Sequence, residues 1–351
     1  MKKESQSLLS WYKKVNYSMP WRNKINPYKI WISEIMLQQT QVQTVKKYYI
    51  SWMKKYPNVY ELAHANIDDI LKLWEGLGYY RRAYNILETA KIIVSSYEGE
   101  LPSQYSELIK LKGIGDYTAS AILSIAFNKN YPAIDGNLKR VLSRLYCINN
   151  TKTFEKKIKN LVLKYMNDNS AGDINQAFMD LGREICTPKN PKCNKCPLND
   201  SCKALQLSKQ DQFPIKSKKN KIKPTYNVAV GLIYKKDKFI ITKRKVNVML
   251  GGLWELPGGK KNNKESYEDC LHREIQEELN IKITINKKIG LVKHSYSHFS
   301  INLIGYLCSY LSGTPQAIVS DDIKWIKTSN IKNFAFPKST NKLFKLIMDK
   351  N

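Results

Sequence analysis

Two glycines one residue apart, Gly113 and Gly115, place a sharp turn between two apolar segments. Apolar residues on both sides of the turn repeat at helical spacing, which predicts a helix, a hairpin and a second helix starting at Asp116. The free N–H groups and the positive dipole end of that second helix can bind a phosphate without preference for a base sequence. Lys112 adds a cation beside them. The stretch therefore predicts contact with a nucleic-acid backbone.

Asp135 follows the hairpin and directly precedes another amphipathic helix. The apolar stripe of that helix is formed by Leu138, Val141, Leu142 and Leu145. The simplest role for Asp135 is that of a helix N-cap, where N–H donors and the helix dipole would keep its carboxylate ionised. Because an anion beside a phosphate-binding hairpin repels DNA, its presence suggests a chemical task for the charge.

The hairpin followed by this aspartate resembles the helix-hairpin-helix superfamily of DNA glycosylases. The resemblance implies that Asp135 stabilises the positive charge that develops on the deoxyribose as a base leaves, while Asn137 and Tyr117 hold Asp135 or the sugar in place. Members that also cut the strand carry a lysine where this chain has Tyr117, and a tyrosine cannot form an imine. The chain is therefore similar to the monofunctional branch. The resemblance assigns DNA contacts to Lys112, Gly113, Gly115 and Lys139.

A second carboxylate, Glu34, lies in a segment that predicts a helix from about Pro27. Its neighbours at helical spacing are mostly apolar and include Ile30 and Leu37. Apolar surroundings are expected to raise the pKa of a carboxyl group. On spacing alone, a surface glutamate at the edge of the stripe is the commoner outcome.

The segment WISEIMLQQTQV, which contains Glu34, closely resembles the catalytic-acid segment of MutY-type adenine DNA glycosylases. The resemblance implies that Glu34 is the general acid that protonates N7 of adenine. It also implies that the residues after the helix reach into the duplex around the mismatch. These residues are Gln38, Gln39 and Thr40.

The loop of residues 76–82, GLGYYRR, combines two glycines, two tyrosines and two arginines. Exposed rings offer stacking faces and arginines offer phosphate contacts, as in proteins that open a duplex with an inserted side chain. The alternative is a helix–helix turn whose tyrosines pack inward. In the MutY-type family this loop matches the intercalating loop, which implies that Tyr79 is the wedge.

A compact cysteine motif with the spacing C-x6-C-x2-C-x5-C is formed by Cys186, Cys193, Cys196 and Cys202. Structural zinc sites usually use two short cysteine pairs, whereas this motif has one, and four thiolates can also hold an iron–sulfur cluster. On the residues alone, zinc and a [4Fe–4S] cluster are nearly equal alternatives. The same spacing closes the glycosylase domain of endonuclease III and MutY relatives, which implies a structural [4Fe–4S] cluster. The lysines expected to meet the DNA backbone there are Lys189, Lys192 and Lys195.

The net charge of +28 favours a polyanionic partner. Lysine greatly outnumbers arginine, so a composition bias of the whole genome is the competing explanation. The sequence contains no apolar run of about twenty residues that could span a membrane, and its basic N-terminus lacks the apolar core of a signal peptide. We expect a soluble, monomeric protein of the bacterial cytoplasm, associated with the nucleoid.

Residues 207–225 are polar and basic, which indicates a linker that touches DNA or a plain solvated tether. After Tyr226 the pattern changes to strands, and a hairpin is expected across residues 235–238. Residues 259–281 then nearly complete a Nudix box, with Asn280 where the box has glycine. The acidic side chains that could bind Mg²⁺ bridging a diphosphate are Glu274, Glu277 and Glu278.

MutY-type enzymes carry a Nudix-like C-terminal domain that checks for 8-oxoguanine, usually with the hydrolase box worn away. Here the box is well kept, which is the main departure from the family, yet we expect negligible hydrolysis of 8-oxo-dGTP. A loop near the end of the expected sheet resembles the lesion-reading Phe-Ser-His of the family, with tyrosine replacing phenylalanine. The loop consists of Tyr296, Ser297 and His298.

These features predict a multidomain protein. Residues 1–206 form an all-α helix-hairpin-helix glycosylase domain with an iron–sulfur cluster loop at 186–202, residues 207–225 form a basic linker, and residues 226–351 form an α+β Nudix-like domain. The resemblance implies an adenine DNA glycosylase that acts on double-stranded DNA, removes adenine opposite 8-oxoguanine or guanine, and leaves an abasic site.

Two alternatives from other classes remain. One is a glycosylase-lyase of the endonuclease III type, against which Tyr117 argues. The other is a Nudix hydrolase of nucleotide diphosphates that is merely tethered to DNA, against which the pair of Glu34 and Asp135 argues.

Overall fold

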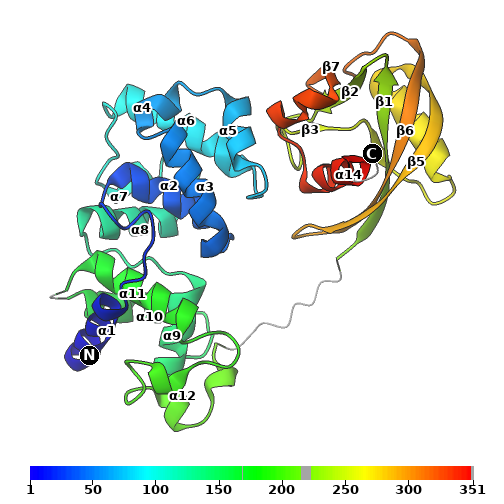
Figure 1. The fold of residues 1–351 in the computed structure, drawn as a ribbon. Coiled ribbons are helices and arrows are strands. Elements are labelled where there is room, and N and C mark those ends of the chain that lie inside the picture. The colour runs from blue at the N-terminus through cyan, green and yellow to red at the C-terminus, as the bar shows by residue number, and fades with distance from the viewer. Residues whose placement is uncertain (168, 215–222, 349–351) are drawn as a thin grey trace. The chain divides into compact units, whose positions relative to one another are not determined.

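The computed structural model describes residues 1–167, 169–214 and 223–348 (Figure 1). The chain divides into two compact units, Met1–His64 with Asn85–Lys219 and Ala65–Tyr84 with Asn220–Asn351. The expected basic linker lies partly outside the described residues, and the boundaries at residues 206 and 225 stay a prediction.

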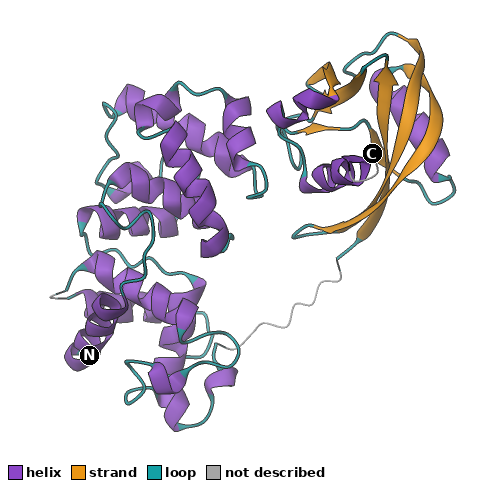
Figure 2. Ribbon diagram, in the orientation of Figure 1, coloured by secondary structure: helices purple, strands orange, loops and turns teal. Residues whose placement is uncertain are grey.

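The described residues before residue 215 form helices and loops and contain no strand (Figure 2). The α-helices are α1 (Lys2–Val15), α2 (Pro27–Leu37), α3 (Val42–Lys55), α4 (Val59–Ala63), α5 (Ile67–Trp74), α6 (Arg81–Ser96), α7 (Tyr105–Leu108), α8 (Asp116–Phe127), α9 (Gly136–Tyr146), α10 (Phe154–Met166), α11 (Ala171–Glu184) and α12 (Lys203–Gln206). Short 3-10 turns cover Cys193–Lys195 and Gln210–Gln212. The all-α prediction for this part of the chain is confirmed.

The expected helix-hairpin-helix is present as α7, the turn and α8. Gly113 has a φ of 82°, a left-handed conformation that glycine adopts without strain. A Cβ atom at Gly113 would lie 3.0 Å from Cβ of Asn85, so the turn also packs closely against α6. The second helix begins at Asp116, as predicted.

Polar caps set the starts of the helices that carry the candidate acids. Asn26 accepts a hydrogen bond from the Lys29 amide at 3.1 Å, and Pro27 occupies the first position of α2, where its missing N–H costs nothing. Asp135 caps α9 by accepting a hydrogen bond from the Leu138 amide at 2.7 Å. Both carboxylate-bearing segments are therefore fixed by local sequence as well as by packing.

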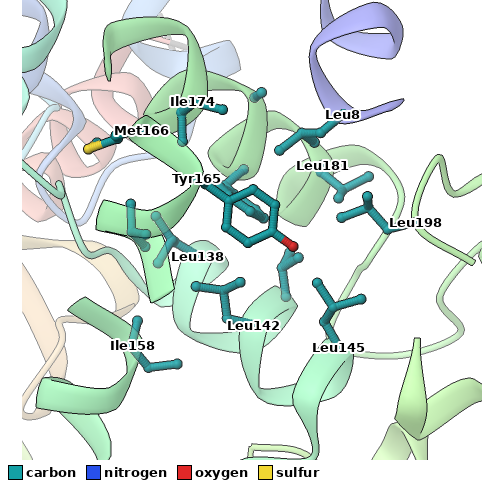
Figure 3. Packing of buried hydrophobic residues seen from close by; sticks show 14 of the residues in the cluster. Leu8, Leu138, Leu142, Leu145, Ile158, Tyr165, Met166, Ile174, Leu181 and Leu198 are labelled. Atoms are coloured by element: carbon teal, nitrogen blue, oxygen red, sulfur yellow. The ribbon is translucent and has the colours of Figure 1, made fainter. Parts of the chain in front are cut away.

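A hydrophobic core joins α1, α9, α10 and α11 (Figure 3). The ring of Tyr165 lies at its middle, and Leu138 and Leu142 from α9 point toward it (Figure 3). Cys186, Cys196 and Leu198 pack against the same core, so the cysteine loop is attached to it by apolar contacts. Burial of this kind stabilises by about 25 cal/mol for each Å² of apolar surface removed from water.

The C-terminal part contains a seven-stranded mixed sheet. The main path has the order β3-β2-β1-β6-β5, with β4 paired to β1 and β7 paired to β2. Among the described residues, β1 and β6 are the only strands that pair in parallel. The strands are β1 (Thr225–Lys235), β2 (Lys238–Lys243), β3 (Trp254–Glu255), β4 (Gly258–Lys260), β5 (Ile281–Ser295), β6 (Ser300–Gly313) and β7 (Asp322–Lys327). The predicted hairpin across residues 235–238 is confirmed, since Tyr234 pairs with Phe239.

Two helices cover opposite faces of this sheet (Figure 2). α13 (Tyr267–Leu279) buries Leu271 and Ile275 against one face, and α14 (Lys338–Met348) buries Leu343 and Phe344 against the other. A short 3-10 helix, Thr328–Asn333, precedes α14. The α+β prediction is confirmed.

Close packing of α11 generates a stability prediction. A Cβ atom at Gly172 would lie 2.8 Å from the Ser124 carbonyl oxygen of α8, so Gly172→Ala forces two backbones apart. We expect a loss of about 1–3 kcal/mol in the free energy of unfolding, measured by urea titration. The matched control is Gly136→Ala, whose Cβ would meet nothing within 4 Å. Equal stability of the two variants would contradict this packing.

Candidate functional site

A cavity of about 480 Å³ opens between the helices of the first unit. Helices α2, α8, α9 and α11 and the segment before α2 supply its walls. The charged and polar side chains that line it include Arg22, Glu34, Gln38, Gln39, Thr40, Tyr117, Asp135, Asn137, Gln176, Asp180 and Arg183. The two carboxylates singled out from the sequence thus share one cavity.

Glu34 is 5% exposed, in the middle of the buried face of α2. The pKa of Glu34 is raised to about 7, mainly by burial and also by the nearby Asp135 carboxylate. A hydrogen bond from the Tyr117 hydroxyl, at 3.0 Å from Oε2, and the charge of Arg22 lower the pKa in part. The prediction of a raised pKa is confirmed, and the surface alternative is wrong.

Asp135 accepts two hydrogen bonds, one on each carboxylate oxygen. The Leu138 amide donates to Oδ1 at 2.7 Å, and the Asn137 side chain donates to Oδ2 at 2.8 Å. Burial raises the pKa of Asp135, and these donors together with Arg140 oppose that rise. The cap therefore acts in the predicted direction but is outweighed by desolvation, which the sequence could not show.

Tyr117 contacts the other carboxylate. Its hydroxyl donates to Glu34 and lies 3.9 Å from the sulfur of Met179. Of Asn137 and Tyr117, which were both expected to hold Asp135 or the sugar, Asn137 is the one that donates to Asp135. Burial and the two carboxylates raise the pKa of Tyr117 well above its usual value, so the phenol stays protonated and acts as a donor.

The cavity wall contains a buried ion pair that was not predicted from the sequence. Asp180 on α11 has no exposed side-chain surface and binds Arg22 at 2.6 Å and Arg183 at 3.0 Å. An aspartate inside the apolar stripe of an amphipathic helix is the sequence signal that could have indicated it. The pair neutralises a charge that would otherwise lie unpaired in the wall.

The residues that follow α2 also line this cavity. Gln38 donates to the Thr118 hydroxyl at 3.1 Å and so ties the end of α2 to α8 beside the hairpin. Gln39 adopts a left-handed backbone with a φ of 57°, and its side chain is exposed. The Thr40 hydroxyl donates to the Gln38 carbonyl at 3.4 Å.

The two lysines assigned to DNA contacts are both in ion pairs. Lys112 binds Glu88 and Lys139 binds Glu155, and both glutamates are largely exposed. Exposed pairs of this kind are worth at most about 1 kcal/mol, so a phosphate can replace the carboxylate. Lys112 and Lys139 can therefore exchange their glutamate partners for phosphates of a DNA backbone.

The four motif cysteines are free thiols and are partly buried. Burial raises the pKa of Cys196 to about 12, and the charges of Cys186, Cys202 and Cys193 add to that rise. Cys186, Cys196 and Cys202 pack against one hydrophobic core, although no group of three or more Cys, His, Asp or Glu side chains among the described residues is arranged to hold a metal ion. A metal centre binds cysteine as the thiolate, so its binding displaces the thiol proton and stabilises the charged form that burial disfavours. The donor set therefore fits an iron–sulfur group.

In the second unit, Tyr79 lies at the tip of its loop with 38% of its surface exposed. Gly76 and Gly78, which both precede Tyr79 in the chain, adopt left-handed conformations with φ values of 97° and 76°. Arg82 is only 7% exposed and donates to the Gly78 carbonyl at 2.9 Å. The prediction that Arg82 offers a phosphate contact is therefore wrong, because its guanidinium holds the loop instead.

Tyr296, Ser297 and His298 form the tip between β5 and β6. The Tyr296 hydroxyl and the Ser339 hydroxyl share a hydrogen bond of 2.9 Å, which anchors the loop to α14. Ser297 and His298 are exposed, and the Tyr79 hydroxyl donates to the Ser297 hydroxyl at 2.7 Å within the second unit. The side chains of Ser297 and His298 are thus exposed to solvent, while the neighbouring Tyr296 ring is held in place by its hydrogen bond to Ser339.

The Nudix-like carboxylates are bound within the protein. Arg273 forms ion pairs with Glu265, Glu274 and Glu277 at 2.8–3.0 Å. Glu278 accepts a hydrogen bond from the Gly258 amide at 3.0 Å, and burial raises its pKa to about 8.

Asn280 caps α13 in the left-handed conformation, with a φ of 53°, so the predicted tolerance of asparagine at this position is confirmed.

Over the described residues, the protein has no helix long and apolar enough to cross a membrane.

Three family models match the chain. Residues 32–166 match the HhH-GPD superfamily base excision DNA repair protein, residues 186–202 match the iron-sulfur binding domain of endonuclease III, and residues 229–346 match the NUDIX domain. Their order along the chain is the order predicted from the motifs.

Curated relatives match over nearly the whole chain. The adenine DNA glycosylase of Buchnera aphidicola subsp. Baizongia pistaciae (strain Bp) is 39% identical over 96% of this chain and 95% of that protein. The adenine DNA glycosylase of Homo sapiens is 29% identical over 97% of this chain and 73% of that protein.

Solved structures match the helical part. A thermostable thymine-DNA glycosylase has a TM-score of 0.54 at 28% identity, and the match covers 59% of this chain and 98% of that one. A non-covalent complex of endonuclease III with DNA has a TM-score of 0.50 at 24% identity, covers 57% of this chain and 94% of that one, and shows the fold alone.

Proposed function

The chain belongs to the adenine DNA glycosylase family of base excision repair, and on this premise we propose that it hydrolyses the N-glycosidic bond of adenine opposite 8-oxoguanine or guanine without cutting the strand. The observation that carries the proposal is the cavity in which buried Glu34 and capped Asp135 meet. Two carboxyl groups in one site, held in different environments, can act as an acid and an anion.

The target nucleotide must leave the base stack, because neither carboxyl group can reach it inside a duplex. The cavity is within the size range of pockets for small ligands. Gln38, Gln39 and Thr40, which line the cavity, are proposed to fill the duplex around the extruded adenosine. Tyr79 is proposed to enter the stack as the wedge.

Glu34 is proposed as the general acid. A pKa of about 7 leaves a large fraction of the carboxyl group protonated at neutral pH, which is the range in which proton donation works best. Transfer of this proton to N7 turns adenine into a neutral leaving group. The Tyr117 hydroxyl then stabilises the carboxylate that is left behind.

Asp135 is proposed to stabilise the cation formed on the sugar. As the C1′–N9 bond breaks, its electrons leave with adenine and the deoxyribose acquires oxocarbenium character. The carboxylate of Asp135 is held by the Leu138 amide and the Asn137 side chain and needs no rearrangement to face this charge. Water adds to C1′, and the proton that it loses returns to Glu34 directly or through solvent.

Strand cleavage by an imine requires an amine near C1′. No lysine lines the cavity in the described part of the chain, and Tyr117 occupies the position at which the lyase branch carries one. These points support the monofunctional reading over the glycosylase-lyase alternative. The match to adenine DNA glycosylases over nearly the whole chain weighs against a tethered Nudix hydrolase.

The hairpin residues are proposed to bind the DNA backbone on the side of the lesion. Gly113 and Gly115 expose backbone amides, and Lys112 and Lys139 exchange their glutamate partners for phosphates. The exchange makes affinity dependent on salt concentration.

Residues 186–202 bind an iron–sulfur cluster, and we propose the [4Fe–4S] form with Cys186, Cys193, Cys196 and Cys202 as ligands. A Mg²⁺ ion at Glu274, Glu277 and Glu278 also stays a proposal, and it requires Glu274 and Glu277 to leave Arg273. The monomeric state and the location at the bacterial nucleoid stay predictions.

The first prediction concerns the acid. Glu34→Gln removes the proton donor but keeps the size of the side chain, so adenine release from a duplex with adenine opposite 8-oxoguanine should fall by at least about 100-fold. Single-turnover kinetics with saturating enzyme measures the step, and the affinity for the duplex is expected to be unchanged. A rate near that of the wild type would remove Glu34 from the mechanism.

The second prediction concerns pH. Only protonated Glu34 can donate, so the rate should fall as pH rises through about 7. Tyr117→Phe removes a hydrogen bond that favours the carboxylate, so the pKa of Glu34 and the alkaline limb of the rate profile should move to higher pH. Tyr97→Phe, which removes a tyrosine–carboxylate bond at Glu107 away from the cavity, is the control. A limb that moves down in Tyr117→Phe would contradict the proposed role.

The third prediction concerns strand cutting. Borohydride should trap little covalent protein–DNA complex while free adenine is released. Efficient trapping at a lysine of the wild-type protein would show an imine and restore the glycosylase-lyase alternative.

The fourth prediction concerns the lesion. 8-Oxoguanine differs from guanine at N7–H and O8, and the exposed Ser297 and His298 offer donors and acceptors for that edge. The double change Ser297→Ala with His298→Ala should reduce the preference for 8-oxoguanine over guanine by about 1–3 kcal/mol. The preference is measured by dividing the single-turnover rate constant by the dissociation constant for each duplex and comparing the two quotients. Excision opposite guanine should persist. An unchanged ratio would exclude the loop from lesion reading.

A further inference from the structure

Arg144 is a buried cation beside the cysteine loop. It lies near the end of α9, its surface is 3% exposed, and no role follows for it from the chemistry of adenine release. Arginine is rarely buried to this extent unless a partner compensates its charge.

The guanidinium is saturated with hydrogen bonds. Nε donates to the carbonyls of Gln210 and Phe213 at 2.9 and 3.1 Å, and Nη2 donates to the Pro188 carbonyl at 3.2 Å. Nη1 donates to the Thr187 carbonyl at 2.7 Å and to Sγ of Cys186 at 3.4 Å. One side chain thus connects the segment that begins the cysteine loop to the segment that follows it.

The backbone of Arg144 contacts the other end of the motif. The Cys202 thiol donates to the Arg144 carbonyl at 3.7 Å, so this residue touches both the first and the last cysteine of the set. The contact to Cys186 comes from the side chain and the contact to Cys202 comes from the main chain. A change of side chain therefore removes the first contact and leaves the second.

The charge of Arg144 has no carboxylate to balance it. Its hydrogen-bond partners are neutral carbonyl oxygens and one cysteine sulfur, and no ion pair to an aspartate or glutamate involves it within the described residues. Burying an unpaired charge is expensive. An iron–sulfur cluster held by four thiolates carries net negative charge and would supply the missing counter-charge at this place.

We propose that Arg144 is the positioning residue and the buried counter-cation of the iron–sulfur cluster. It holds the first ligand and the following segment in place for the cluster, and its N–H group at Cys186 draws electron density from that sulfur. Removing it should speed the loss of iron and shift the reduction potential to a more negative value, because a nearby positive charge and N–H···S bonds favour the reduced form. The inference rests on the iron–sulfur assignment of residues 186–202.

The test compares three full-length variants purified without oxygen. Arg144→Gln removes the charge and most of the donors, and Arg144→Lys keeps the charge but cannot span the same carbonyls. Arg82→Gln is the matched control, since Arg82 is also buried and bonded to backbone carbonyls but lies at the start of α6, beside the Tyr79 loop and outside the cysteine motif. The measurements are the rate of iron release to a chelator, followed by the cluster absorbance, and the reduction potential of the protein on an electrode without DNA, so that DNA binding by the Tyr79 loop does not enter either readout.

We expect Arg144→Gln to release iron about tenfold faster than the wild type, with a more negative potential. Arg144→Lys should release iron faster but keep a potential near that of the wild type, and Arg82→Gln should match the wild type in both. Wild-type values in folded Arg144→Gln would overturn the proposal, as would an equal effect of Arg82→Gln.

Should Arg144→Gln fail to fold, Arg144→Lys decides alone, since wild-type iron release in that variant overturns the proposal and faster release supports it. An iron-free wild-type protein would instead refute the cluster assignment itself.

Discussion

The burial of the Glu34 carboxyl group is the constraint on which the candidate site depends. Desolvation by the packed faces of α2 and its neighbours raises the pKa of Glu34 to about 7, and Asp135 adds to the rise from across the same cavity. A cation bonded directly to Glu34 would lower that pKa and remove the acid. Arg22 instead forms its ion pair with Asp180, and its charge lowers the pKa of Glu34 only in part.

Local patterns in the sequence predicted the parts of this site that depend on neighbours along the chain. The glycines of the hairpin and the cap at Asp135 each express a short-range rule that recurs in the structure, and the cysteine spacing recurs in the match of residues 186–202 to an iron-sulfur binding domain. Other contacts join residues far apart in the sequence, and no local pattern announces them. These are the Tyr117–Glu34 hydrogen bond, the Arg22–Asp180 pair and the bonds of Arg144 to the cysteine loop.

Two expectations differ from the structure for one physical reason, which is burial. Arg82 was expected to meet phosphate because arginines in a loop usually face solvent, yet its guanidinium is buried under the Tyr79 loop. The cap of Asp135 was expected to favour the anion, yet desolvation raises the pKa of that carboxyl group. Burial depends on tertiary packing, so it is the quantity that residue types and spacing predict least well.

The most direct test of the acid–anion pair is the titration of Glu34 itself. Protein labelled with ¹³C at the glutamate carboxyl carbons would be followed by NMR across pH 4–9, with Glu34→Gln used to assign the resonance. The account predicts an apparent pKa of about 7 for Glu34. A value near 4.5, that of an ordinary glutamate, would mean that the carboxyl group is ionised at neutral pH and cannot be the proton donor.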